Sequence, residues 1–304
     1  MSEFAREPAA ETRFRDPFPR PSFMTLTVAL ALVVTPSVGL LAAELRDPKA
    51  ETERFAHEAD QALRADLLEQ GFAPLASSAS PDVARLAALG IEVLIPERAV
   101  SLESGAATLT AQPASSAALT RALAPLTAEL ARYPAAFFER ARLRRLLLCA
   151  SLREGTEAIP SLPNYHGALL VDVDAEAPYL RRLVHHEVFH FADYADDDQL
   201  SRDPAWLALN DRYFVYGDGG RFRREPGAGR FSAENPGFVS RYATSALEED
   251  KAETFAMRMT APKRFAELLV NDATLRAKSA AVEAQLRKLS PSLDDRFFAA
   301  VDAR

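Results

Sequence analysis

The spacing of apolar residues predicts that the first part of the chain is mainly helical. Phe55, Ala59, Ala62 and Leu63 recur at helical spacing, which predicts a helix over residues 51–68. The other elements predicted before residue 126 are helices at 82–89 and 115–132, a short strand at 91–95 and a loop at 101–116. Residues 44–125 are therefore expected to form a mainly helical N-terminal segment.

Beyond residue 126, short apolar runs alternate with longer helical patterns. Residues 143–152 and 167–173 are strand candidates, because each is a compact apolar block bounded by polar or turn residues. Residues 176–194 read as a long helix whose first turn accommodates Pro178. Further helices are predicted at 135–142, 203–214 and 246–289, the last interrupted near Pro262. We expect an α+β fold with a small mixed sheet and a helical C-terminal half.

A run without any charged side chain, residues 25–43, lies near the N-terminus. Arginines precede the run and small residues end it at Ala43, as in a signal peptide cleaved there or an uncleaved membrane anchor. Met24 is an alternative start. We therefore expect export to a periplasmic or secreted location, or membrane attachment through residues 25–43, with a cytoplasmic location as the alternative.

Composition excludes some classes of function. The chain is 48% hydrophobic and 26% charged, as in ordinary soluble globular proteins. Its formal net charge of -7, without a basic cluster interleaved with aromatics, predicts that it does not bind nucleic acid. The single cysteine, Cys149, lies in an apolar run, which predicts a buried side chain rather than a catalytic thiol.

The most informative motif is His186-Glu187-Val188-Phe189-His190, within the long predicted helix. Histidines at positions i and i+4 lie on one face of a helix, where two imidazoles can bind one Zn²⁺. The intervening Glu187 is offset around the helix, so its carboxylate can act as general base toward the attacking water. The alternative is that both histidines are ordinary core or surface residues.

A catalytic zinc site needs a third protein ligand, and the chain has no histidine after His190. We expect a carboxylate from residues 247–255, where Glu249 and Glu253 lie four apart on one helical face. One would bind zinc and the other would hold the distal N–H of a ligand histidine. Asp250 is the chief competing ligand, and a solvated acidic face is the alternative interpretation.

Three neighbouring residues have less specific signals. Tyr242 precedes Glu249 by seven residues and could donate a hydrogen bond to a tetrahedral oxyanion, or simply pack. Asp193 could orient a ligand imidazole or begin the solvated run 196–198. His185 points about 100° away from the metal-facing stripe, so we expect packing or a supporting contact rather than ligation.

The segments 185–190, 237–242 and 249–255 together resemble zinc-binding metallopeptidases, gluzincins similar to the catalytic domain of anthrax lethal factor. The resemblance covers residues 130–270, and 206–210 and 216–220 also look like that group. It implies zinc on three residues, namely His186, His190 and Glu249. It implies Glu187 as general base, Tyr242 as transition-state donor and Glu253 in contact with a ligand histidine.

We therefore expect a zincin-like metallopeptidase domain at residues 126–304, after a disordered leader with the export or anchor segment at 1–43 and the helical region at 44–125. The expected activity is zinc-dependent hydrolysis of a peptide or protein substrate. Two alternatives remain: a zinc hydrolase of a non-peptide amide or ester, and a catalytically lapsed zinc-binding sensor or partner-binding protein. The strand at 167–173 is the candidate edge strand for docking an extended substrate.

Overall fold

The computed structural model describes residues 48–104, 107–217, 219 and 227–303. The predictions for residues 1–43, including the export signal and the disordered leader, lie outside these residues. Among the helices that are described, none combines the length and the apolar character needed to cross a membrane.

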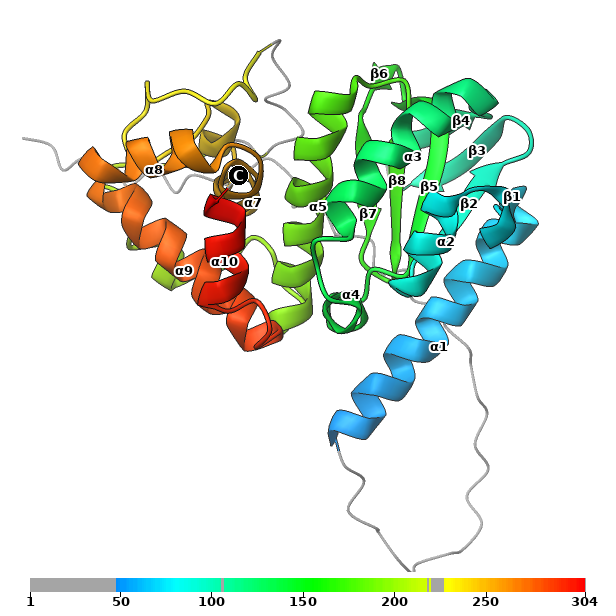
Figure 1. Cartoon of the computed structure of the whole chain (residues 1–304), viewed down its shortest axis with the longest axis horizontal. Helices are drawn as coiled ribbons and strands as arrows, with labels where there is room; N and C mark the ends of the chain where they lie inside the picture. Colours follow the sequence, from blue (N-terminus) through cyan, green and yellow to red (C-terminus); the bar gives the residue numbers. More distant parts are fainter. Residues whose placement is uncertain (1–47, 105–106, 218, 220–226, 304) are drawn as a thin grey trace, which may run out of the picture. The chain divides into compact units, whose positions relative to one another are not determined.

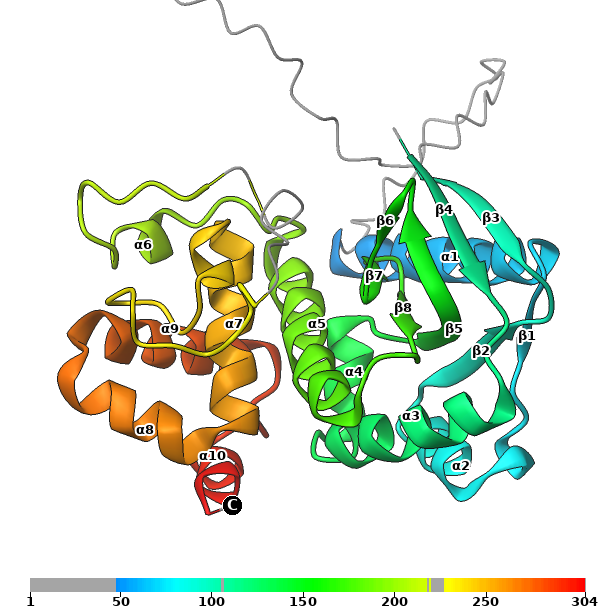
Figure 2. The same cartoon turned by 90° about the horizontal axis from the view of Figure 1, so that it is seen from above.

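The described strands build one mixed sheet around a long central strand, β5 (Figures 1 and 2). Strands β2 and β8 pair with the first half of β5 in parallel, whereas β4 and β6 pair antiparallel with its second half. β1 extends the sheet beyond β2, β3 beyond β4, and β7 beyond β8. The strands are β1 (Phe72–Pro74), β2 (Glu92–Pro96), β3 (Val100–Ser104), β4 (Ala107–Gln112), β5 (Arg145–Glu154), β6 (Glu157–Ala158), β7 (Ser161–Asn164) and β8 (Ala168–Asp172).

The continuous apolar run of β5 arises because both faces of the sheet are covered. Leu146 and Leu148 pack with the helices on one face, while Leu147 and Cys149 join Leu67 on the other. A strand buried on both sides needs consecutive rather than alternating apolar residues. Leu67 belongs to α1 (Pro48–Glu69), and the opposite face carries α2 (Pro81–Ala88), α3 (Ser116–Leu130), α4 (Ala135–Ala141) and α5 (Ala177–Asp197).

The helices of the C-terminal half lie on the side of α5 that faces away from the sheet (Figure 2). α7 packs directly on α5, with the Phe189 and Phe255 rings 5.5 Å apart. Pro262 begins α8, as expected for a proline that cannot continue the preceding helix. The remaining elements are α6 (Pro204–Leu207), the 3-10 helix η3 (Tyr242–Thr244), α7 (Leu247–Thr260), α8 (Pro262–Asn271), α9 (Ala273–Leu289) and α10 (Asp295–Asp302). The predicted α+β fold with a mixed sheet and a helical C-terminal half is confirmed.

Residues 44–125 contain the predicted helices α1, α2 and the start of α3, but they contribute more strands to the sheet than the sequence predicted. This region contributes β1 to β4, and the stretch 101–116, predicted as a loop, contains most of β3 and all of β4. β3 and β4 are small and polar because β3 lies at the edge of the sheet, and the two strands bury few large side chains, such as Val100 on β3 and Leu109 on β4. The boundary predicted near residue 125 falls inside α3.

Two further predictions need correction. The helix predicted over 203–214 ends at Leu207, and the Asp211 side chain accepts a hydrogen bond from the Tyr213 backbone N–H at 2.8 Å. Such local side-chain contacts compete with helix formation. The strand at 167–173, β8, is not an edge, since it pairs with both β5 and β7. β7 is the edge strand on this side, and Pro163 is tolerated there.

Candidate metal centre

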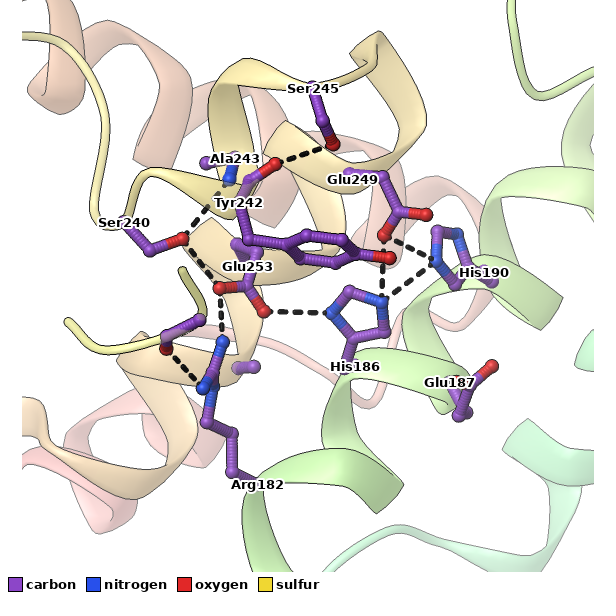
Figure 3. Close-up of polar contacts among 12 residues, drawn as sticks. Arg182, His186, Glu187, His190, Ser240, Tyr242, Ala243, Ser245, Glu249 and Glu253 are labelled. Atoms are coloured by element: carbon purple, nitrogen blue, oxygen red, sulfur yellow. Dashed lines mark hydrogen bonds and ion pairs between the residues drawn. The ribbon is translucent and has the colours of Figure 1, made fainter. Parts of the chain in front are cut away.

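Two helices bring the motif histidines and one downstream carboxylate to a common point (Figure 3). His186 and His190 extend from successive turns of α5, and their Nε2 atoms are 3.0 Å apart. Glu249, in the first turn of α7, places Oε2 3.0 Å from Nε2 of His186 and 3.5 Å from Nε2 of His190. The three potential ligand atoms all lie within 4.8 Å of one another.

This donor set fits a zinc ion. Two imidazoles and a carboxylate are one of the three-ligand sets of catalytic zinc sites. Ligands about 2.0–2.1 Å from a shared tetrahedral zinc lie about 3.3 Å apart, close to the observed separations. His186 Nδ1 is 3.0 Å from the Glu253 carboxylate, and the neutral ring with its proton on Nδ1 would donate to that carboxylate and offer the Nε2 lone pair to a metal.

His186 and the carboxylates of Glu249 and Glu253 shift one another's pKa values. Burial lowers the pKa of His186, but hydrogen bonds and attraction from Glu249 and Glu253 outweigh it and raise the pKa to about 10. Burial raises the pKa values of both carboxyls, yet hydrogen bonds from the two histidines hold the pKa of Glu249 well below its usual range, and Arg182 and His186 lower the pKa of Glu253. Both glutamates are therefore ionised at neutral pH, as a metal ligand and a hydrogen-bond acceptor must be.

Glu253 is fixed from a second side by contacts that the sequence did not reveal. Ser240 Oγ donates to Glu253 Oε2 at 2.6 Å, and Arg182, one turn before His186 on α5, donates to the same oxygen. Arg182 also donates to the Gly229 carbonyl and lies 4.4 Å from the centroid of the Phe231 ring. The carboxylate that contacts His186 is thus held by an arginine anchored to residues 229–231.

Glu187 lies on the same turn of α5 and is 5% exposed. Its Oε1 accepts a 2.6 Å hydrogen bond from Ser161 Oγ, whereas its buried Oε2 has no hydrogen-bond partner among the described residues. Ser161 opens β7, 26 residues before Glu187, in a stretch without a predicted element. No sequence signal pointed to it.

Tyr242 lies in η3 with its ring centroid 6.0 Å from that of His186. Burial raises the pKa of its phenol well above 10, and the Glu249 carboxylate beside it raises the pKa further. The phenol therefore stays neutral near neutral pH and keeps its proton available as a hydrogen-bond donor.

Asp250, the competing ligand candidate, lies outside this group. Its Oδ2 accepts hydrogen bonds from Trp206 at 3.0 Å and Tyr216 at 2.6 Å, and pairs with Lys278 Nζ at 2.7 Å. Asp250 and Lys278 are both fully buried. This carboxylate therefore neutralises a buried lysine on α9 and is not directed at the histidines.

Asp193 and His185 also have partners other than the metal centre. Asp193 Oδ1 accepts hydrogen bonds from Lys251 at 2.9 Å and Gln285 at 2.6 Å, and His190 Nδ1 has no hydrogen-bond partner among the described residues. Among the described residues, no hydrogen bond therefore joins Asp193 to a ligand imidazole. His185 Nε2 lies 2.9 Å from Glu129 and its Nδ1 2.5 Å from the Tyr133 hydroxyl, which agrees with a packing role.

Comparisons with known proteins add a distant structural likeness. No protein-family model matches the chain, and no curated protein sequence matches it. A solved structure that is similar belongs to a proposed zinc-binding metallo-peptidase from Bacteroides caccae. The two chains are 15% identical with a TM-score of 0.49, over 76% of this chain and 93% of that one. A likeness this low carries no argument about function, which must come from the site itself.

Proposed function

We propose that this protein is a zinc-dependent hydrolase of the gluzincin type that cleaves peptide bonds. The observation that carries the proposal is the convergence of His186, His190 and Glu249, whose ligand atoms lie within 4.8 Å of one another. A neighbouring carboxylate, Glu187, keeps one oxygen without a partner among the described residues. A metal-binding group together with a free general base is the arrangement that hydrolysis requires.

The three ligands would hold zinc, which supplies Lewis-acid catalysis when bound. Glu187 Oε2 is the group placed to accept a proton from the attacking water and later to donate it to the leaving amine. Tyr242 retains its phenolic proton and can donate a hydrogen bond to the oxyanion of the tetrahedral intermediate. Glu253 orients His186 by accepting a hydrogen bond from its Nδ1–H group.

The position of β7 at the edge of the sheet supports the proposal that the substrate is an extended peptide. An edge strand offers unpaired backbone groups to which a peptide can add by hydrogen bonds. β7 pairs only with β8 among the described strands, and its first residue contacts Glu187. The strand proposed to dock the substrate is therefore β7, residues 161–164, in place of the strand at 167–173. Export or membrane attachment through residues 25–43 stays part of the proposal.

The test is peptide cleavage by the zinc-loaded full chain. A mixed peptide library is digested and analysed by mass spectrometry with wild type, Glu187→Gln and the exposed α8 control Glu267→Gln. We expect cleavage by wild type and control. The Glu187→Gln variant should retain zinc but lose activity by about 10²–10⁴-fold, because the amide cannot act as base.

Three results would contradict the proposal. Equal cleavage by Glu187→Gln would remove the assigned base. Turnover restricted to esters or non-peptide amides would indicate a different hydrolase. Zinc binding without turnover of any of these substrates would indicate a lapsed, non-catalytic metal site.

A further inference from the structure

The contact between Ser161 and Glu187 joins the edge of the sheet to the active-site helix. Ser161 is paired with Val171 in the antiparallel register of β7 and β8. The next residue, Leu162, packs into the cluster on the α1 face of the sheet. Because side chains alternate along a strand, Ser161 points to the opposite face, where α5 lies. Its hydroxyl there lies 2.6 Å from Glu187 Oε1.

The direction of this hydrogen bond follows from the chemistry of the pair. The Ser161 hydroxyl is the donor, and Glu187 Oε1 is the acceptor. Ser161 is 9% exposed and Glu187 is 5% exposed, so water competes little for the bond. One carboxylate oxygen is thereby occupied, and the other has no partner among the described residues.

We propose that Ser161 is a positioning residue for the general base. A glutamate has three side-chain torsions, and a hydrogen bond to one oxygen fixes the orientation of the other. Ser161 holds Oε1, so Oε2 presents its lone pairs to the attacking water. The inference rests on the proposed function, and it adds a residue on a different element from α5, which carries the motif of residues 186–190.

The serine also links β7 to α5, so a role in stability alone must be distinguished from positioning. A residue that only supports the fold would change the stability of the protein and leave turnover by the folded enzyme unaltered. A residue that positions the base lowers kcat while leaving KM and zinc binding unchanged, because the hydroxyl contacts neither the metal ligands nor, by this proposal, the substrate. Misplacement of a catalytic group by about 1 Å can cost on the order of 100-fold in rate.

The first experiment measures kcat, KM and zinc content of zinc-loaded full-chain variants. Ser161→Ala removes the hydroxyl, Ser161→Thr keeps it, and Ser101→Ala on the edge strand β3 is the matched control, since its side chain is exposed. We expect kcat of Ser161→Ala to fall about 10- to 100-fold, with KM within about twofold and zinc content unchanged. Ser161→Thr should recover most of kcat. A kcat of Ser161→Ala equal to that of the control would overturn the proposal.

The second experiment needs no activity. Urea unfolding of the metal-free full chain is compared among wild type, Ser161→Ala, Glu187→Ala and the double variant. If the hydrogen bond exists, the effect of the double variant on the unfolding constant differs from the product of the two single effects by about tenfold or more. Multiplicative effects would overturn the inference. If wild type cleaves no peptide, the proposed function fails, and this cycle still decides whether Ser161 holds Glu187.

Discussion

Removing the Glu253 carboxylate should weaken zinc binding although Glu253 is not a ligand. Glu253 is 1% exposed and its carboxylate joins three groups: His186 Nδ1 at 3.0 Å, Ser240 Oγ at 2.6 Å, and Arg182. In Glu253→Ala, His186 loses the acceptor that fixes its tautomer and ring orientation. The Arg182 guanidinium loses its counter-charge at the same time.

The size of the effect can be estimated from these contacts. Loss of an outer partner of a ligand histidine lowers metal affinity about 10- to 100-fold, or roughly 1.4–2.7 kcal/mol. The fold is destabilised as well, but Arg182 is 18% exposed, so solvent reduces the penalty below the roughly 3–5 kcal/mol of a fully buried pair. Glu253→Gln keeps an oxygen acceptor for Nδ1, so its zinc affinity should stay within about tenfold of wild type.

The assay is competition for zinc between the full-chain protein and a chromophoric chelator at fixed pH. The control is Glu267→Ala on the exposed face of α8. Circular dichroism checks that each variant is folded at the assay temperature. A folded Glu253→Ala variant that binds zinc as tightly as the control would refute the assignment of Glu253 as the group that orients His186.

Two further predictions concern buried charges outside the metal centre. Glu129→Gln should lower the unfolding free energy at pH 7 on the order of 3 kcal/mol, because Arg132 and His185 lose a buried carboxylate. Burial raises the pKa of Glu129, but hydrogen bonds from His185 and Arg132 outweigh it and hold the pKa well below 4.5. Its stabilisation is therefore present above pH 4.5 and lost at lower pH, so urea unfolding curves of wild type and variant should converge on acidification; a constant difference would contradict this. Asp250→Asn should destabilise the fold by a similar amount, because Lys278 is fully buried, yet leave zinc content unchanged. Loss of zinc from a folded Asp250→Asn protein would show that Asp250 belongs to the metal centre.

Local patterns in the sequence were sufficient to identify the candidate metal ligands that recur at helical spacing. The spacing of four between His186 and His190 places both on one face of α5, and the same spacing relates Glu249 and Glu253 on α7. Residue spacing alone could not decide among Glu249, Glu253 and Asp250. Which carboxylate reaches the histidines depends on which face of α7 packs against α5. Asp250 lies on another face, where it pairs with the buried Lys278 on α9.

The rest depends on contacts between segments far apart in the chain. Ser161 and Ser240 are single serines in stretches without a periodic pattern, and each acquires its role only when a strand or loop meets a helix. The sequence did not predict β3 and β4 for a related reason. An edge hairpin of small polar residues is stabilised by pairing with β5, and its own sequence carries little apolar periodicity.

The most direct test of the account is the zinc content of the purified full chain, measured by elemental analysis after reconstitution and dialysis. Wild type, Glu249→Ala and the neighbouring control Glu248→Ala are compared, since Glu248 is outside the group of converging ligand atoms. We predict about one zinc per chain in wild type and Glu248→Ala, and its loss from Glu249→Ala. Full zinc content in Glu249→Ala, or none in wild type, would contradict the proposed metal centre.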